Sequence, residues 1–309
     1  MVTFDKSSAL APSVAPPRPV RSEEDLTHTR QGPIGPTHVV PDGYTGPQPP
    51  GAISESDYQR MQAVYGNIAS GESSLRFDTA NFFQNDDGTP KSLLADPLGY
   101  AKAALDAGAF KVQYMEYVQD LVKTPAGLKM LEQLDHSKFE TIISQNSAGD
   151  GNNTKPDNSD NSAYDRVTGL PSKGTASKIE VDPTATVWDG ECGNEPWMAD
   201  RPRFGFYHEL VHAYHNTSGD AESWGGHLRA GCDPHVDEDP VAWPIGNVEW
   251  HTAGLGPWAN ESVSENSIRG QMGVPLRPTY SGRTWSPAPH AVDLEEPPRV
   301  PPVHAHHAL

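Results

Sequence analysis

The distribution of proline is the feature that most limits what this chain can fold into. Of its 30 prolines, ten lie within residues 1–50 and six within residues 287–309. Proline fixes φ and removes a backbone donor, so such segments build neither helix interiors nor central strands. They also hold few large apolar side chains, and burial there cannot offset the entropy of ordering the chain. We therefore predict a disordered leader over residues 1–51, a folded domain over 52–286 and a disordered tail over 287–309.

Charge and hydropathy exclude several classes of partner. The net charge of -18 opposes binding to nucleic acid or to anionic lipid, because both require a cationic surface. The sequence has no run of 18 apolar residues, so we expect no membrane span. Its first residues lack the basic start and apolar stretch of a secretory signal peptide. Cys192 and Cys232 are too few for a disulfide framework, and we expect free thiols.

Helical patterns dominate the first part of the domain, residues 52–135. Ser54 can cap a helix in which apolar residues recur at spacings of three and four. A longer helix is predicted over residues 97–123. Thr124 and Pro125 then supply an N-cap and a first-turn proline for a third helix.

Strand patterns appear in the second part of the domain, residues 136–286. Residues 139–144 form a short apolar run, and residues 178–182 alternate apolar with polar side chains. Between them, residues 145–165 are polar and follow neither a helical nor a strand period, which predicts a loop. Helices followed by a few strands indicate an α+β fold with a small sheet.

The motif that carries chemistry is His208-Glu209-Leu-Val-His212, an H-E-x-x-H sequence within the apolar run 204–214. On a helix, the two histidines lie one turn apart on one face and can bind a single zinc ion. Glu209 is rotated by about 100° and is placed as general base for a water whose pKa the ion lowers. Gly219 is a plausible end for this helix.

A third metal ligand must come from elsewhere in the chain. The metzincin continuation requires glycine and histidine at positions where His215 and Ser218 stand, so that class is excluded. We expect His215 to cap the helix or to support a ligand. Glu249, 37 residues beyond His212 in a helix-like segment, is the favoured third ligand. Four other residues stay open as candidates for that position: Asp220, Glu222, His251 and Glu265.

Three blocks of sequence together resemble the NleD-type zinc metalloproteases, which are type III secreted effectors of bacterial pathogens. The blocks are residues 208–212, 248–256 and 264–280, and the resemblance covers about residues 140–285. It implies a zincin-like catalytic domain and a zinc endopeptidase that is injected into host cells and cleaves host signalling proteins. Mitogen-activated protein kinases are the known substrate type for some members.

The motif helix is also similar, more loosely, to that of clostridial neurotoxin light chains, whose H-E-L-x-H-x-x-H sequence matches residues 208–215. That similarity again implies Glu249 as third ligand. The R-x-x-Y pair of those light chains corresponds to Arg277 and Tyr280, which would stabilise the oxyanion of the tetrahedral intermediate. A salt bridge and a packed ring are the structural alternative for these two residues. Glu265 is expected to hold one of the motif histidines from behind.

The sequence thus predicts a zinc-dependent endopeptidase, secreted and acting in the host-cell cytoplasm after type III translocation. Its expected partner is a protein substrate, such as a host kinase. The proline-rich leader favours export over a resident bacterial metallopeptidase, because an unfolded start suits a secretion channel that threads chains. The alternative is a non-catalytic interaction protein that acts through its proline-rich termini and carries a structural metal site.

Overall fold

The computed structural model describes residues 28–30, 32–35, 37–46, 51–85, 87–146, 151–165, 167–185, 195–222 and 246–280. The predicted tail, both cysteines and the first 27 residues of the predicted leader lie outside these ranges. The chain divides into two compact units, Met1–Gln59 and Arg60–Leu309.

The first unit contains a three-stranded sheet. Strand β1 (His28–Arg30) pairs antiparallel with β2 (Thr37–Val40), and β2 pairs in parallel with β3 (Ile53–Ser54). Val39 is fully buried. Strands β1 and β2 differ from the prediction that residues 1–51 lack regular structure, because strand pairing satisfies their backbone groups despite the flanking prolines.

Helix α1 (Glu55–Ser70) begins at the predicted cap. The Oγ of Ser54 accepts a hydrogen bond from the backbone N–H of Asp57 at 3.1 Å. Met61 and Val64 are buried, at the spacing that the sequence predicts. The expected helix start and its apolar face are therefore confirmed.

Two helices of the second unit also begin where the sequence predicts. Helix α2 spans Pro97–Leu121, and α3 spans Pro125–His136. The Oγ1 of Thr124 accepts a hydrogen bond from the backbone N–H of Gly127 at 3.0 Å, so the predicted cap of α3 is confirmed. Within the described ranges, no helix, not even the 25-residue α2, combines the length and apolar character needed to span a bilayer.

The second unit is built on a four-stranded sheet in the order β4-β5-β7-β6. Strands β4 (Leu75–Asp78), β5 (Thr141–Gln145) and β7 (Ser177–Val181) are parallel, and β6 (Asn153–Pro156) runs antiparallel to β7 at the edge. The strands predicted at residues 139–144 and 178–182 are therefore present, shifted by one or two residues.

The prediction of a loop across residues 145–165 is wrong for β6 and for the short helix α4 (Ser159–Ser162). The residues of β6 are polar or proline, so no hydrophobic alternation marks them. Their strand conformation comes from pairing with β7, a partner about 25 residues away along the chain. Helix α4 is capped by Asn158, whose side chain accepts from the backbone N–H of Asp160 at 3.0 Å.

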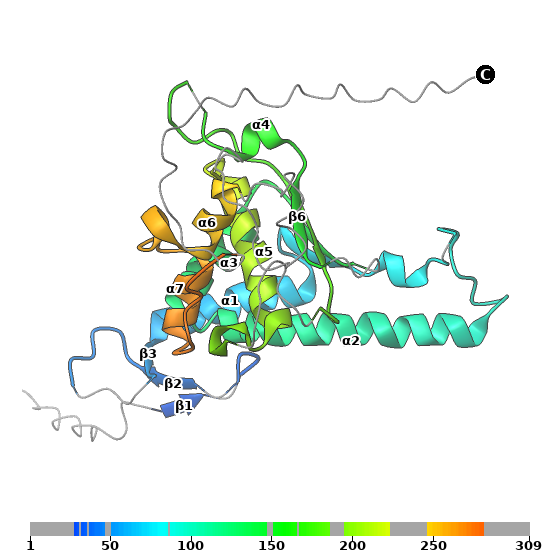
Figure 1. Cartoon of the computed structure of the whole chain (residues 1–309). Coiled ribbons are helices and arrows are strands. Elements are labelled where there is room, and N and C mark those ends of the chain that lie inside the picture. The colour runs from blue at the N-terminus through cyan, green and yellow to red at the C-terminus, as the bar shows by residue number, and fades with distance from the viewer. Residues whose placement is uncertain are drawn as a thin grey trace, which may run out of the picture. The chain divides into compact units, whose positions relative to one another are not determined.

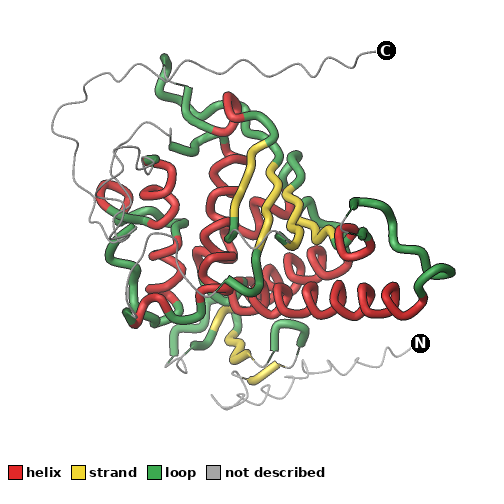
Figure 2. The backbone as a smooth tube through the Cα atoms, turned by 45° about the vertical axis from the view of Figure 1, so that its right-hand side comes forward, coloured by secondary structure: helices red, strands yellow, loops and turns green. Residues whose placement is uncertain are grey.

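Helix α5 (Arg201–Ser218) lies at the centre of this unit, in contact with β6 and β7 on one side (Figure 1, Figure 2). Two short helices, α6 (Asn247–Ala253) and α7 (Glu265–Gln271), contact its other side. Three 3-10 turns complete the described elements: η2 (Ala80–Phe83), η3 (Pro196–Met198) and η5 (Gly256–Trp258). The fold class is α+β, helix-rich with small sheets, as predicted.

Aromatic packing fixes α5 in this position. Phe206 and Tyr207 are fully buried, and burial of each such ring contributes roughly 2 kcal/mol relative to exposure. The ring of Phe206 packs edge-on against Tyr114 of α2, with centroids 4.9 Å apart. The hydroxyl of Tyr207 donates to the backbone oxygen of Tyr117 at 2.9 Å. Large side chains of the predicted apolar run 204–214 are buried: Phe204, Tyr207, Leu210, Val211 and Tyr214.

Candidate metal centre and active site

Helix α5 presents different residues to its two neighbours. His208 and His212 face α6, whereas Glu209 and Asn216, seven residues apart, face the sheet. On the sheet side, the side-chain amide of Asn216 donates to the Oγ of Ser177 on β7 at 3.1 Å. The i, i+4 and i, i+7 spacings place each pair on one face of the helix. The motif therefore separates its histidines from its glutamate, as the sequence predicts.

The end of α5 is also the predicted one. Gly219 is its C-cap in the left-handed region, at φ 74°, where a glycine has no steric penalty. Its backbone N–H donates to the carbonyl oxygen of His215 at 2.9 Å.

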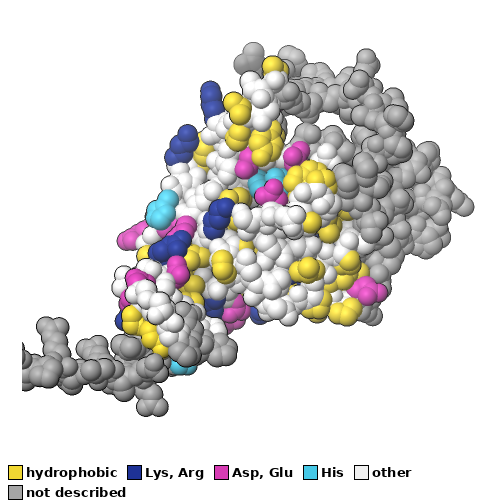
Figure 3. All heavy atoms as spheres, turned by 90° about the vertical axis from the view of Figure 1, so that its left-hand side faces the viewer, with side chains coloured by type: hydrophobic (Ala, Val, Ile, Leu, Met, Phe, Trp, Pro, Cys, Tyr) yellow, Lys and Arg dark blue, Asp and Glu magenta, His cyan; other side chains and the backbone are white. Residues whose placement is uncertain are grey.

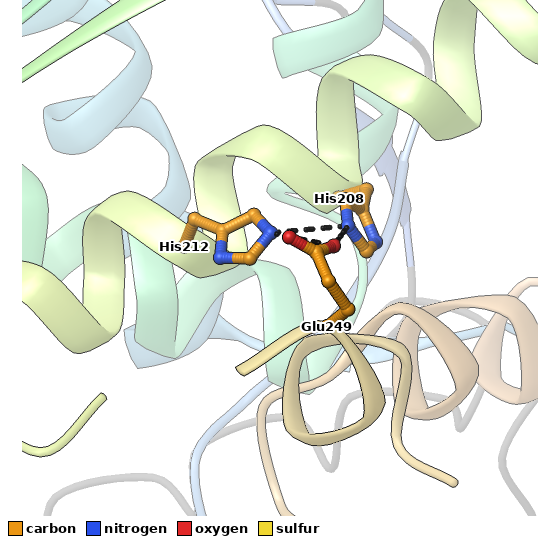
Figure 4. Close-up of side chains that lie close together, drawn as sticks. All are labelled: His208, His212 and Glu249. Carbon is orange, nitrogen blue, oxygen red and sulfur yellow. Dashed lines mark hydrogen bonds and ion pairs between the residues drawn. The ribbon is translucent and has the colours of Figure 1, made fainter. Parts of the chain in front are cut away.

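Three electron-pair donors meet between α5 and α6, and we call them the donor cluster: His208 Nε2, His212 Nε2 and Glu249 Oε2. Oε2 of Glu249 lies 3.0 Å from Nε2 of His208 and 3.2 Å from Nε2 of His212, and the two nitrogens are 3.1 Å apart. Figure 4 shows the Glu249 carboxylate pointing from α6 toward both imidazoles. In the part of the chain that the structure describes, these residues form the group that could hold a metal ion.

The opposite ring nitrogens fix the orientation of both imidazoles. Nδ1 of His208 lies 3.1 Å from Oε2 of Glu265, and Nδ1 of His212 lies 3.1 Å from Oγ1 of Thr252. A proton on each Nδ1 leaves the lone pairs of both Nε2 atoms facing the carboxylate oxygen. Three such lone pairs within 3.2 Å repel one another unless a positive charge lies between them.

The geometry of the donor cluster fits a divalent cation. A tetrahedral zinc ion with bonds of about 2.0–2.1 Å holds its ligand atoms roughly 3.3 Å apart, close to the separations seen here. Two histidines and one glutamate are also a donor set that catalytic zinc sites use, with a fourth position left open. The residues present therefore suit such an ion, although their role as ligands stays a prediction.

The electrostatics of the cluster favour positive charge. Burial lowers the pKa of His208, but the hydrogen bonds and charges of Glu249 and Glu265 outweigh it and raise that pKa to about 9. Burial raises the pKa of Glu249, but the charges and hydrogen bonds of His212 and His208 hold it well below its usual value. Without a metal, the negative charges around His208 favour a proton on its ring, and a binding metal ion would have to displace that proton.

Glu265 supports the cluster from behind His208. It is fully buried, and its Oε1 accepts from Nε of Arg269 at 2.7 Å. Its Oε2 accepts from a guanidinium nitrogen of Arg277 at 3.2 Å as well as from His208. Burial raises the pKa of Glu265, but the charges of Arg277 and Arg269 outweigh it and hold the pKa well below its usual value. The expectation that Glu265 holds a motif histidine is confirmed.

Glu209 lies beside the cluster with its carboxylate toward β6. It is 7% exposed, and burial raises its pKa against the opposing charges of His212 and His208. Its Oε2 accepts a hydrogen bond from Oγ1 of Thr154 at 2.7 Å. Oε1 accepts none from the residues that the structure describes. The carboxylate thus has one anchored oxygen and one oxygen available to a reactant.

Tyr280 and Arg277 reach the site from the segment after α7. The hydroxyl of Tyr280 donates to Oε2 of Glu249 at 2.6 Å, and burial together with the charge of Glu249 raises the pKa of Tyr280 well above its usual value. The guanidinium of Arg277 lies 4.1 Å from the centroid of the Tyr280 ring and pairs with Glu265. The ion pair and packed ring that the sequence offers as an alternative are therefore present. The oxyanion roles of both residues stay predictions.

The remaining candidates for the third ligand lie outside the donor cluster. Asp220 accepts from Nδ1 of His215 at 2.9 Å, and the His215 ring packs against that of His251 at a tilt of 39°, with centroids 4.0 Å apart. Burial lowers the pKa of His251 to about 3, so its ring is neutral. Neither these residues nor Glu222 enter the donor cluster. His215 lies on the last turn of α5, where its ring binds Asp220.

Sequence reasoning missed two hydroxyls of the site. Thr252 lies three residues after Glu249 on α6, a spacing that places both on one helix face, so inspection of that helix would have found it. Thr154 lies in a segment predicted to be a loop, and the sequence carries no signal for it. Figure 3 shows the resulting surface, in which histidine and acidic side chains lie together in a hollow beside hydrophobic ones.

The profile of peptidase family M91, described as effector proteins, matches residues 102–280, more than half of the 309 residues. The chain belongs to this family. It is the family of the NleD-type effector proteases that the sequence resembles, so that prediction is confirmed. No curated protein and no solved structure matches the chain.

Membership of the M91 family establishes the coarse function. The chain is a peptidase and an effector, so its substrate is a protein, and the family indicates secretion into a host cell. The matched residues include all of the donor cluster, Glu209 and Tyr280.

Proposed function

We propose that this M91 peptidase is a zinc-dependent endopeptidase in which His208, His212 and Glu249 hold the metal. The observation that carries the proposal is the meeting of three electron-pair donors within 3.0–3.2 Å of one another, next to a buried glutamate. When bound there, zinc supplies a Lewis acid that polarises the scissile carbonyl and lowers the pKa of water.

Glu209 is the general base in this proposal. Its Oε1 takes the proton from the attacking water and later delivers it to the leaving amine. The raised pKa of Glu209 suits this exchange, because a carboxylate with a pKa nearer to neutrality returns its proton more readily. Oε2 stays bound to Thr154 and takes no part in the transfer.

Tyr280 is proposed to stabilise the oxyanion. Its raised pKa keeps the phenol protonated, so its hydroxyl remains a hydrogen-bond donor at neutral pH. In the described structure that hydrogen goes to Glu249, and substrate would have to compete for it. Arg277, paired with Glu265, is proposed to hold the Tyr280 ring and to add positive charge near the oxyanion.

The proposed substrate is a host signalling protein such as a kinase, reached after type III translocation. We expect comparison of new protein N-termini in host cells that produce wild type or Glu209→Ala to reveal cleavage with wild type only. Both proteins should contain equal amounts of zinc, because Glu209 is not a ligand. Equal cleavage by the two would refute the role of Glu209, whereas absence of cleavage by both would favour an interaction protein with a structural metal.

Export can be tested separately. Residues 1–50 fused to a reporter should direct its type III secretion if the leader carries the signal. Failure of export would refute this part of the proposal and leave the peptidase chemistry unaffected.

A further inference from the structure

Thr154, on the edge strand β6, binds the carboxylate of Glu209. Its Oγ1 lies 2.7 Å from Oε2 of Glu209 and 3.1 Å from the backbone oxygen of the same residue. A threonine hydroxyl has one hydrogen to donate, and a charged acceptor at the shorter distance is the stronger partner. The hydrogen therefore goes to Oε2.

Strand pairing fixes where this hydroxyl lies. Thr154 pairs with Ile179 of β7, which is fully buried, and their side chains share the sheet face that packs on α5. The next residue, Lys155, points to the opposite face, where it pairs with Glu180 at 3.0 Å. Because threonine is β-branched, its χ1 is also restricted. The donor is thus held by the sheet rather than by a loop.

A fixed donor matters to a glutamate that must transfer a proton. The glutamate side chain has three rotatable bonds, and α5 fixes only its Cα and Cβ positions. A hydrogen bond to Oε2 limits rotation of the carboxylate and sets the direction in which Oε1 points. Misplacement of a reacting group by about 1 Å can reduce the rate by roughly a hundredfold.

We propose that Thr154 is a positioning residue whose hydroxyl orients the carboxylate of Glu209 for proton transfer. This inference rests on the proposed function of Glu209 as general base. The competing explanation is that Thr154 only ties α5 to the sheet. Ser177, on the same sheet face, also bonds to α5, because its Oγ accepts from Asn216. Asn216 lies two helical turns away from Glu209, so Ser177 provides a matched control.

Kinetics separate the two explanations. The probe is a peptide spanning the bond mapped by new N-termini, and each full-length variant is assayed at equal zinc content. Thr154→Val should lower kcat about 10-fold to 100-fold with KM changed by less than about threefold. Thr154→Ser, which keeps the hydroxyl, should retain kcat within about threefold. Ser177→Ala should lower the melting temperature without lowering kcat. A kcat of Thr154→Val within about threefold of wild type would overturn the proposal.

Melting temperatures test the contact without reference to activity. Thr154→Val should lower Tm by about 5 °C when residue 209 is glutamate, because a buried carboxylate loses its donor. In the Glu209→Gln background the same change should lower Tm by less than half as much. Equal shifts in the two backgrounds would overturn the coupling. Absence of cleavage by wild type would instead refute the proposed function itself, whereas an active wild type with an unimpaired Thr154→Val would refute the positioning role alone.

Discussion

Replacing Glu265 with glutamine should destabilise the protein strongly, although the two side chains have almost the same shape. Glu265 is fully buried and accepts hydrogen bonds from Arg269, Arg277 and His208. A glutamine keeps one acceptor oxygen and replaces the other with an N–H₂ donor. At Oε2, that donor would face both Arg277 and His208.

The magnitude follows from what stays buried after the change. Arg269 and Arg277 are 1% and 3% exposed, so both guanidinium charges lose their shared carboxylate inside the protein. Breaking a buried ion pair by removing one partner typically costs about 3–5 kcal/mol. Loss of two charge-assisted hydrogen bonds, at about 1.5–3 kcal/mol each, leads to the same range. We therefore expect Glu265→Gln to lower the free energy of unfolding by about 3–5 kcal/mol.

The assay is urea unfolding followed by circular dichroism, with zinc affinity measured on the same preparations. Glu180→Gln is the matched control, because Glu180 binds two lysines at the surface of the sheet and should cost at most about 1 kcal/mol. Since Glu265 also orients His208, zinc affinity should fall by about 10-fold to 100-fold. A loss below about 1 kcal/mol for Glu265→Gln would refute the reasoning, as it would show that the two arginines find other compensation.

Three further outcomes are expected. Removal of metal by a chelator should lower Tm, and added zinc should restore it. A ligand that binds only the folded state stabilises that state by about 4 kcal/mol when its concentration is a thousandfold above Kd. An unchanged Tm would argue against an ion in the donor cluster. Gly219→Ala should lower the free energy of unfolding by about 2 kcal/mol more than Gly88→Ala. Both glycines have positive φ, so both substitutions strain the backbone. A Cβ at Gly219 would also lie 2.4 Å from the backbone oxygen of Ser172, whereas a Cβ at Gly88 would have no atom within 4 Å. Hydrogen bonds from Lys178 and Lys155 lower the pKa of Glu180, so the small stability advantage of wild type over Glu180→Gln should be full above pH 4.5 and be lost as the pH falls through the lowered pKa; a constant difference down to low pH would contradict the shift.

Local signals in the sequence determined helices α2, α3 and α5 of the second unit, and with α5 the motif. Thr124 and Pro125 define the start of α3 because capping and a first-turn proline act within a few residues. The H-E-x-x-H spacing likewise places His208 and His212 on one face of α5, since helical geometry alone fixes that relation. The position of Glu249, 37 residues beyond His212, also favoured it over nearer acids as the third ligand. The sequence alone does not show that its carboxylate lies next to the two histidines.

Tertiary structure decided everything that depends on partners distant along the chain. Strand β6 has no hydrophobic alternation, and it forms because β7 supplies its backbone hydrogen bonds. Thr154 consequently reaches Glu209 across 55 residues, a contact that no local pattern contains. Packing also paired Arg277 with Glu265, the salt bridge that the sequence offered as an alternative to an oxyanion role. The sequence therefore specified the candidate side chains of the site, whereas long-range packing specified how each is oriented, because orientation is set by contacts between elements.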